Sequence, residues 1–247
     1  MPLCQVLVLY YIHEIGARRA KAPPPTIYSY YGQEIDKIMR CQPHRRSTGI
    51  NIKPASNLHH APRIAAAIGC PLGHFLTLNL QQMGVSPFNA SSTMSELMQR
   101  YQKWVTRPRL SARWKATPAF YAWVLENDEV VGVHAHCMLH LPSGSEAEYI
   151  DKVISWLVRL TGTEPPLNAI HMEASPNPEN RSYYLIKGGH PAVTAFFNRV
   201  HVPQGEIIGK RTGTSMNIGR TAKENLRREG RYRKAQRRFM PSLHAQG

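Results

Sequence analysis

Acidic residues, cysteines and long apolar runs are all scarce in this chain. Its 247 residues include 16 Asp and Glu and four cysteines, none of them in a Cys-x-x-Cys pair. This argues against a disulfide framework and favours a reducing, cytoplasmic location. The apolar stretch Val6–Ile12 is too short to span a bilayer and has no basic residue before it. We therefore expect neither a membrane span nor a signal peptide.

The few acids are opposed by 31 Lys and Arg, which gives a formal net charge of +15. Such a surplus points to a polyanionic partner, most simply nucleic acid. A hydrophobic fraction of 42% is enough for a real core, which excludes a wholly disordered chain. A basic protein that is merely soluble can share this composition, so charge alone does not decide the function.

Patterning divides the chain into three parts. Residues 1–70 are poorly patterned, are broken by Pro23–Pro25 and read as an N-terminal extension. Residues 71–200 read as a folded α+β domain. Residues 201–247 read as a basic C-terminal tail with a helix over residues 217–239. From Lys210 to Arg238, eleven Lys or Arg stand against two Glu. The expected DNA-binding residues are Lys210, Arg211, Arg220, Arg227, Arg228, Arg231 and Arg233.

The middle part alternates between two hydrophobic periodicities. A period of two predicts strands, and a period of 3.6 predicts amphipathic helices. The predicted strands cover residues 75–80, 119–126, 130–141 and 168–173, and the predicted helices cover residues 92–105, 145–160 and 178–187.

Three histidines alternate with apolar residues between Gly132 and His140. Successive side chains of a strand point to opposite faces, so His134 and His136 share one face. His140 shares that face but falls near the strand end, and we expect no site role for it. Two imidazoles side by side on a sheet are a natural way to present nitrogen ligands to a metal.

A hairpin turn at residues 127–129 would bring Glu126 near the two histidines. In an even-sum register, Glu126 lies on the same face as His134 and His136, with cross-strand neighbours about 5 Å apart. A register slip of one residue would separate them. Glu126, His134 and His136 are therefore the predicted metal ligands, and such a set leaves coordination positions open.

Tyr184 and Lys187 are three residues apart in the predicted helix 178–187 and share a face, whereas Tyr183 points elsewhere. A tyrosine phenol is a poor nucleophile at neutral pH. A metal that polarises a phosphate, and an ammonium that stabilises developing charge, would compensate. We predict Tyr184 as the nucleophile, Lys187 as its support and Tyr183 as a packing residue. A plain helix C-terminal cation is the alternative for Lys187.

Three motifs resemble, in the same order, those of the HUH endonucleases, which include rolling-circle replication initiators and relaxases. Phe75-Leu76-Thr77-Leu78 resembles the first motif, His134-Ala135-His136 the second, and Tyr184-Leu185-Ile186-Lys187 the third. Glu126 falls where initiators of this family often carry an acidic third ligand. The resemblance covers residues 73–190 and is nearest to bacterial plasmid and filamentous-phage initiators.

The resemblance implies a ferredoxin-like (HUH/RRM-like) antiparallel sheet backed by helices, within residues 71–200. It also implies a Mg²⁺ or Mn²⁺ ion and the nicking and joining of single-stranded origin DNA through a 5′-phosphotyrosine. No Gly-x-x-x-x-Gly-Lys-Ser/Thr sequence occurs, so a host helicase is expected to unwind the duplex. Two alternatives stay open, along with the oligomeric state: a non-catalytic basic nucleic-acid-binding protein with a structural metal, and a single-tyrosine transposase or mobilisation relaxase.

Overall fold

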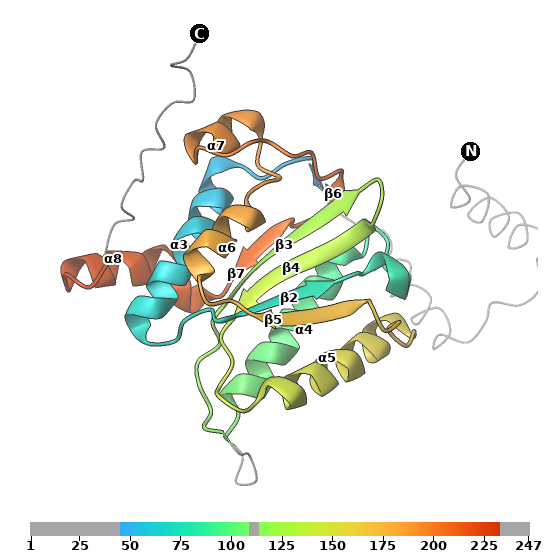
Figure 1. Ribbon diagram of the computed structural model, residues 1–247, viewed down its shortest axis with the longest axis horizontal. Helices are drawn as coiled ribbons and strands as arrows, with labels where there is room; N and C mark the ends of the chain where they lie inside the picture. The colour runs from blue at the N-terminus through green and yellow to red at the C-terminus, as the bar shows by residue number, and fades with distance from the viewer. Residues whose placement is uncertain (1–44, 109–113, 233–247) are drawn as a thin grey trace, which may run out of the picture. The chain divides into compact units, whose positions relative to one another are not determined.

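The computed structural model in Figure 1 describes residues 45–108 and 114–232. These residues belong to one compact unit that begins at Arg45. The expectations for residues 1–44, and for Arg233 as a DNA-binding residue, lie outside the described residues.

The centre of the molecule is a five-stranded antiparallel sheet with the strand order β5-β2-β4-β3-β7. The chain builds four of these strands in a β-α-β-β-α-β succession and adds the fifth at the end. The elements are β2 (His74–Leu78), α4 (Ala90–Thr106), β3 (Tyr121–Asp128), β4 (Gly132–Leu139), α5 (Glu146–Thr161), β5 (Ile170–Ala174) and β7 (Thr212–Thr214). The expected α+β class, an antiparallel sheet backed by helices, is confirmed.

Helices α4 and α5 cover one face of the sheet (Figure 1). Alternation along β3 and β4 sends Trp123, Leu125, Ala135 and Cys137 to this face, where all four are buried. Cys137 therefore lies on the apolar face of β4, away from the histidines. The histidines of β4 are left to the other face.

The opposite face is covered by α3 (Ile52–Ile68) and α6 (Pro178–Leu185), with α7 (Pro191–Phe196) and α8 (Arg220–Arg228) beside them. Leu58 and Ile64 of α3 pack in one core with Val124 and Met138 of the sheet. Residues 52–68 are thus part of the folded unit, which differs from the expected extension over residues 1–70. The helix is rich in alanine and holds Pro62, so its apolar stripe is weak.

The C-terminal part also departs from the expected tail. Residues 207–214 return to the fold: β6 (Ile207–Ile208) pairs with β1 (Arg46–Ser47), and β7 pairs with β3. Both isoleucines of β6 are buried. The expected helix over residues 217–239 is shorter, because a 3₁₀ turn at Met216–Ile218 precedes α8 and α8 ends before Gly230.

His59 and His60 are held neutral beneath α8. The Arg63 guanidinium lies 2.8 Å from His60 Nδ1, and since it can only donate, that nitrogen is an acceptor. Burial, reinforced by Arg63 and Lys223, lowers the pKa of His60 to about 3 and that of His59 to about 4. Below pH 6.5 these histidines take up protons in the unfolded chain but not in the native protein. Stability is therefore expected to fall as the pH drops from 6.5 toward 4.

Thermal unfolding between pH 7 and pH 5 checks this. We expect the Tm of wild type to fall by about 2–4 °C more than that of His60→Gln. His171→Gln is the matched control, because the His171 side chain is 69% exposed. Equal pH slopes for wild type and His60→Gln would contradict the prediction.

Candidate metal centre and tyrosine site

The β3–β4 hairpin has the even-sum register that the sequence predicted. Glu126 lies directly opposite His134. The turn is fixed by Asp128, whose carboxylate accepts hydrogen bonds from the backbone N–H groups of Val130 and Val131. Gly132, with φ +73°, then closes the turn. The two histidines and the glutamate consequently share one face of the sheet.

Glu126, His134 and His136 form a buried Glu-His-His group that could bind a metal ion. Glu126 Oε2 lies 3.0 Å from His134 Nε2 and 3.4 Å from His136 Nε2. One nitrogen or oxygen from each residue lies within 4.8 Å of the others. Carboxylate and imidazole ligands suit several divalent metals, so the set does not name the ion.

The second ring nitrogen, Nδ1, of each imidazole also has a hydrogen-bond partner. His134 Nδ1 donates to the carbonyl of Gly132 at 2.9 Å, and His136 Nδ1 lies 3.1 Å from Thr77 Oγ1. Such contacts orient a histidine so that its Nε2 is presented to a ligand. Thr77 belongs to the first of the three motifs, and its place one strand away from His136 gives that motif a physical role.

The charges of the group are strongly coupled. Burial would raise the pKa of Glu126, but hydrogen bonds from His134 and His136 and the Lys187 ammonium hold that pKa well below its usual range. Burial would lower the pKa of His134, but its bond to Glu126 outweighs this and raises it. For His136 burial wins, and its pKa is lowered. Glu126 is therefore an anionic carboxylate inside the fold.

A free carboxylate oxygen also fits a bound cation. Glu126 Oε1 is buried and has no hydrogen-bond partner among the residues that the structure describes. A buried unpaired acceptor is costly unless something satisfies it. A divalent cation next to the two Nε2 atoms would meet this need.

Tyr184 of α6 and Lys187 of the following turn reach the same place. The helix starts at Pro178, and the Asn177 side chain caps it by accepting from Asn180 N at 3.1 Å. Tyr184 Oη lies 3.4 Å from His136 Nε2. The helix ends at Leu185, two residues earlier than expected, and Lys187 follows it in the turn before Gly188.

Lys187 contacts both Glu126 and Tyr184. Its Nζ lies 2.9 Å from Glu126 Oε2 and 3.8 Å from the centre of the Tyr184 ring. Tyr184 is 38% exposed, so part of its side chain reaches the solvent. Tyr183 points away and packs against His59, under the Arg199 guanidinium. The structure thus places Tyr184 and Lys187 together and Tyr183 apart.

Phe75 and Arg181 also lie at the site, although neither was predicted as a site residue. The Phe75 ring is stacked on His136, with ring centres 5.5 Å apart, and meets Tyr184 edge-on at 6.0 Å. The Arg181 guanidinium lies over Phe75 and pairs with Glu173. Arg181 is one helical turn before Tyr184, a spacing that could have suggested a shared face.

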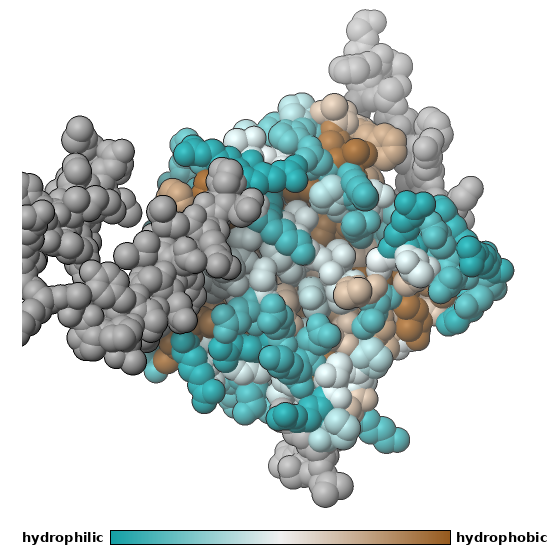
Figure 2. All heavy atoms as spheres, turned by 180° about the vertical axis from the view of Figure 1, so that it is seen from behind, coloured by the Kyte–Doolittle hydropathy of each residue, from teal (hydrophilic) through white to brown (hydrophobic). Residues whose placement is uncertain are grey.

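The expected DNA-binding residues do not form one group. Lys210, Arg220, Arg227, Arg228 and Arg231 are exposed, and the α8 region is strongly hydrophilic at the right of Figure 2. Arg211 differs, because only 4% of it is exposed. Its guanidinium donates its hydrogen bonds within the fold, a position that does not match the exposed DNA contact predicted for it.

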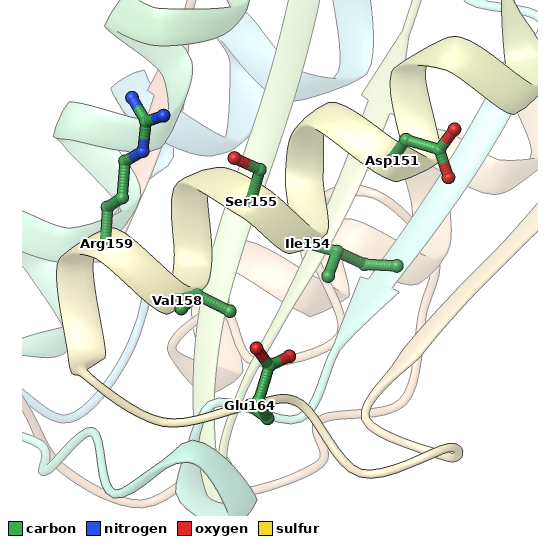
Figure 3. Close-up of a pocket in the computed structure, with 6 residues that line it drawn as sticks. All are labelled: Asp151, Ile154, Ser155, Val158, Arg159 and Glu164. Carbon is green, nitrogen blue, oxygen red and sulfur yellow. The ribbon is translucent and has the colours of Figure 1, made fainter.

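Two surface hollows lie away from this site, one on α4 and one on α5. One is lined by Asp151, Ile154, Ser155, Val158, Arg159 and Glu164 (Figure 3). It lies on α5, which covers the sheet face opposite to the histidines. It contains neither a histidine nor a tyrosine, and we assign no chemistry to it.

Comparison of the chain with protein-family models, with curated proteins and with solved structures gave no match. Within residues 45–108 and 114–232, no helix is both long and apolar enough to cross a membrane. The function proposed below therefore rests on the geometry and charge of the site.

Proposed function

We propose that this protein is a metal-dependent DNA nicking and joining enzyme of the HUH endonuclease class. In this proposal it starts rolling-circle replication of a plasmid, phage or integrated element. The observation that carries the proposal is the approach of Tyr184 Oη to His136 Nε2, 3.4 Å, beside a buried Glu-His-His group. The β-α-β-β-α-β succession with strand order β5-β2-β4-β3 supports a ferredoxin-like sheet.

Each residue of the site has a role in this proposal. Glu126, His134 and His136 would hold Mg²⁺ or Mn²⁺, which when bound supplies Lewis-acid polarisation of a phosphoryl oxygen. Tyr184 Oη attacks the phosphorus and forms a Tyr–O–P bond while the P–O3′ bond breaks. The phenol loses one proton and the departing 3′-oxygen gains one. Lys187 stabilises the negative charge on the phenol oxygen and the phosphate. Reversal of the same step rejoins the strand.

The partners follow from the charge and from the reaction. Single-stranded DNA would meet exposed cations such as Lys210, Arg220 and Arg227, so its binding should depend steeply on salt. A host helicase would open the duplex. We propose the cytoplasm as the compartment, since Cys70 and Cys137 are free thiols.

A covalent-adduct assay tests the proposal. Wild type is incubated with Mn²⁺ and a labelled pool of single-stranded hairpin oligonucleotides, then run on a denaturing gel. We expect a protein–DNA adduct that disappears with EDTA and in Tyr184→Phe. Tyr183→Phe is the matched control and should keep the adduct, because Tyr183 packs against His59 and not at the site.

Two results would contradict the assignment. An adduct that survives Tyr184→Phe but not Tyr183→Phe would identify Tyr183 as the nucleophile in place of Tyr184. Salt-sensitive binding without any adduct would favour the non-catalytic nucleic-acid-binding alternative. That alternative has less support, because a structural zinc site uses four closed ligands. The metal-ligating group found in the described part of the chain offers three.

A further inference from the structure

Arg211 is a buried cation in the turn between β6 and β7. Its Nε donates to Ser47 Oγ at 3.2 Å. Nη1 donates to the carbonyls of Gln204 at 3.1 Å and Leu125 at 3.4 Å. Nη2 donates to the carbonyls of Ser47 and Gly205, both at 2.5 Å. All five N–H groups of the guanidinium are therefore used, and none is left for a ligand.

These bonds fix the part of β3 that carries Glu126. Leu125, the residue before it, is held on both sides: its N–H donates to the Arg211 carbonyl at 2.7 Å, and its carbonyl accepts from Nη1. Asn127, the residue after it, donates its N–H to the Gln204 carbonyl at 3.0 Å, which also accepts from Arg211. The backbone on both sides of Glu126 is thus tied to one guanidinium.

The charge of Arg211 acts on the same residue. Burial lowers the pKa of Arg211 to about 10, and the negative charges of Glu126 and Glu206 oppose this change. The guanidinium therefore stays positive at neutral pH. Its charge is opposite to that of the Glu126 carboxylate, which Lys187 contacts from the turn after α6.

We infer that Arg211 is a positioning residue of the metal centre, which holds Glu126 in place for a divalent cation. This inference rests on the proposed function. Lysine cannot replace it, because an ammonium has three donors for the five acceptor contacts that Arg211 makes. Two buried acceptors would lose their partners, and the segment around Glu126 would relax.

The neighbouring residue supplies the control. Lys210 is exposed, and its side chain remains available to DNA. The test measures Mn²⁺ affinity from the EPR signal of the free ion, and single-stranded DNA affinity over a series of salt concentrations. Both are recorded on the full chain for Arg211→Lys, Lys210→Met and wild type, at a temperature where circular dichroism shows each variant folded.

We expect opposite patterns from the two variants. Arg211→Lys should weaken Mn²⁺ binding by about 10- to 100-fold, as loss of an outer contact to a ligand does. The salt slope of DNA binding should not change, because lysine keeps the positive charge. Lys210→Met should keep the Mn²⁺ affinity and reduce the salt slope by about one. If Arg211→Lys does not fold, Ser47→Ala removes one acceptor and should weaken Mn²⁺ binding by about threefold to fivefold.

Other outcomes would overturn the inference. A folded Arg211→Lys, or in its place Ser47→Ala, with wild-type Mn²⁺ affinity would show that the guanidinium serves stability alone. If wild type itself binds no Mn²⁺, the failure lies in the metal centre of the proposed function, and the inference falls with it.

Discussion

Glu126→Gln is expected to weaken Mn²⁺ binding by more than about 100-fold, beyond the range seen for outer-shell contacts, and to abolish the DNA adduct. The amide keeps the shape of the side chain but removes its charge. The carboxylate is the anionic member of the group, and His134, His136 and Lys187 all lie against its Oε2. Isothermal titration with Mn²⁺ and the adduct gel measure the two effects.

Asp128→Asn is the matched control for that variant. Asp128 belongs to the same strand as Glu126. Its Oδ2 lies 3.7 Å from His134 Nδ1, the nitrogen that faces away from the Glu-His-His group. It supports a ligand and is not one of the three, so we expect a loss of about tenfold or less. If the Mn²⁺ affinity of Glu126→Gln is within threefold of the wild-type value, Glu126 is not a metal ligand.

Lys187→Met is expected to change two properties in opposite directions: Mn²⁺ binding tightens by at least about tenfold, and adduct formation falls about 100-fold. The Lys187 ammonium lies 2.9 Å from Glu126 Oε2, where it competes with any cation. Two unit charges 4 Å apart interact by about 4 kcal/mol near a protein surface. The lysine can turn aside toward Tyr184, so only part of that energy opposes the metal.

Tyr184→Phe separates these two roles. It removes the oxygen of the proposed nucleophile and leaves the Lys187–Glu126 pair, so its Mn²⁺ affinity should stay at the wild-type value. Weaker Mn²⁺ binding by Lys187→Met than by wild type would show that the lysine supports the metal and does not compete with it. Unchanged adduct formation would show that Lys187 has no part in the chemistry.

Local patterns predicted the features that depend on local geometry. Alternation placed His134 and His136 on one face, and the even hairpin brought Glu126 opposite His134. Helical spacing likewise predicted that Tyr184 and Lys187 would lie together. In each case the residues are within a few positions of one another or joined by a short turn. The strand period fixes the first relation, and the single turn after α6, in which Lys187 N donates to the Tyr184 carbonyl, keeps the second.

Features that depend on distant segments were not predicted. Helix α3 has a weak apolar stripe, and it is recognised only through its packing on Val124 and Met138. Arg211 stands among many basic residues, and nothing in its neighbours marks it as buried. Its environment is created by Ser47 and Leu125, which are far away in the chain. Sequence patterning treats all cations of residues 201–247 alike, whereas the fold buries one and exposes others.

The hydrogen bonds of Arg211 also decide when, during synthesis, the site can take its final form. Arg211 is separated by 86 residues from Leu125 and by 164 from Ser47. During synthesis the chain thus contains Glu126, both histidines and Tyr184 before it contains Arg211, the residue that fixes the backbone of β3 around Glu126. A product that stops before Thr212–Thr214 would also leave the edge of β3 unpaired, and open edges promote aggregation. Truncated chains should therefore be lost to aggregation or proteolysis and should not accumulate with an incomplete site.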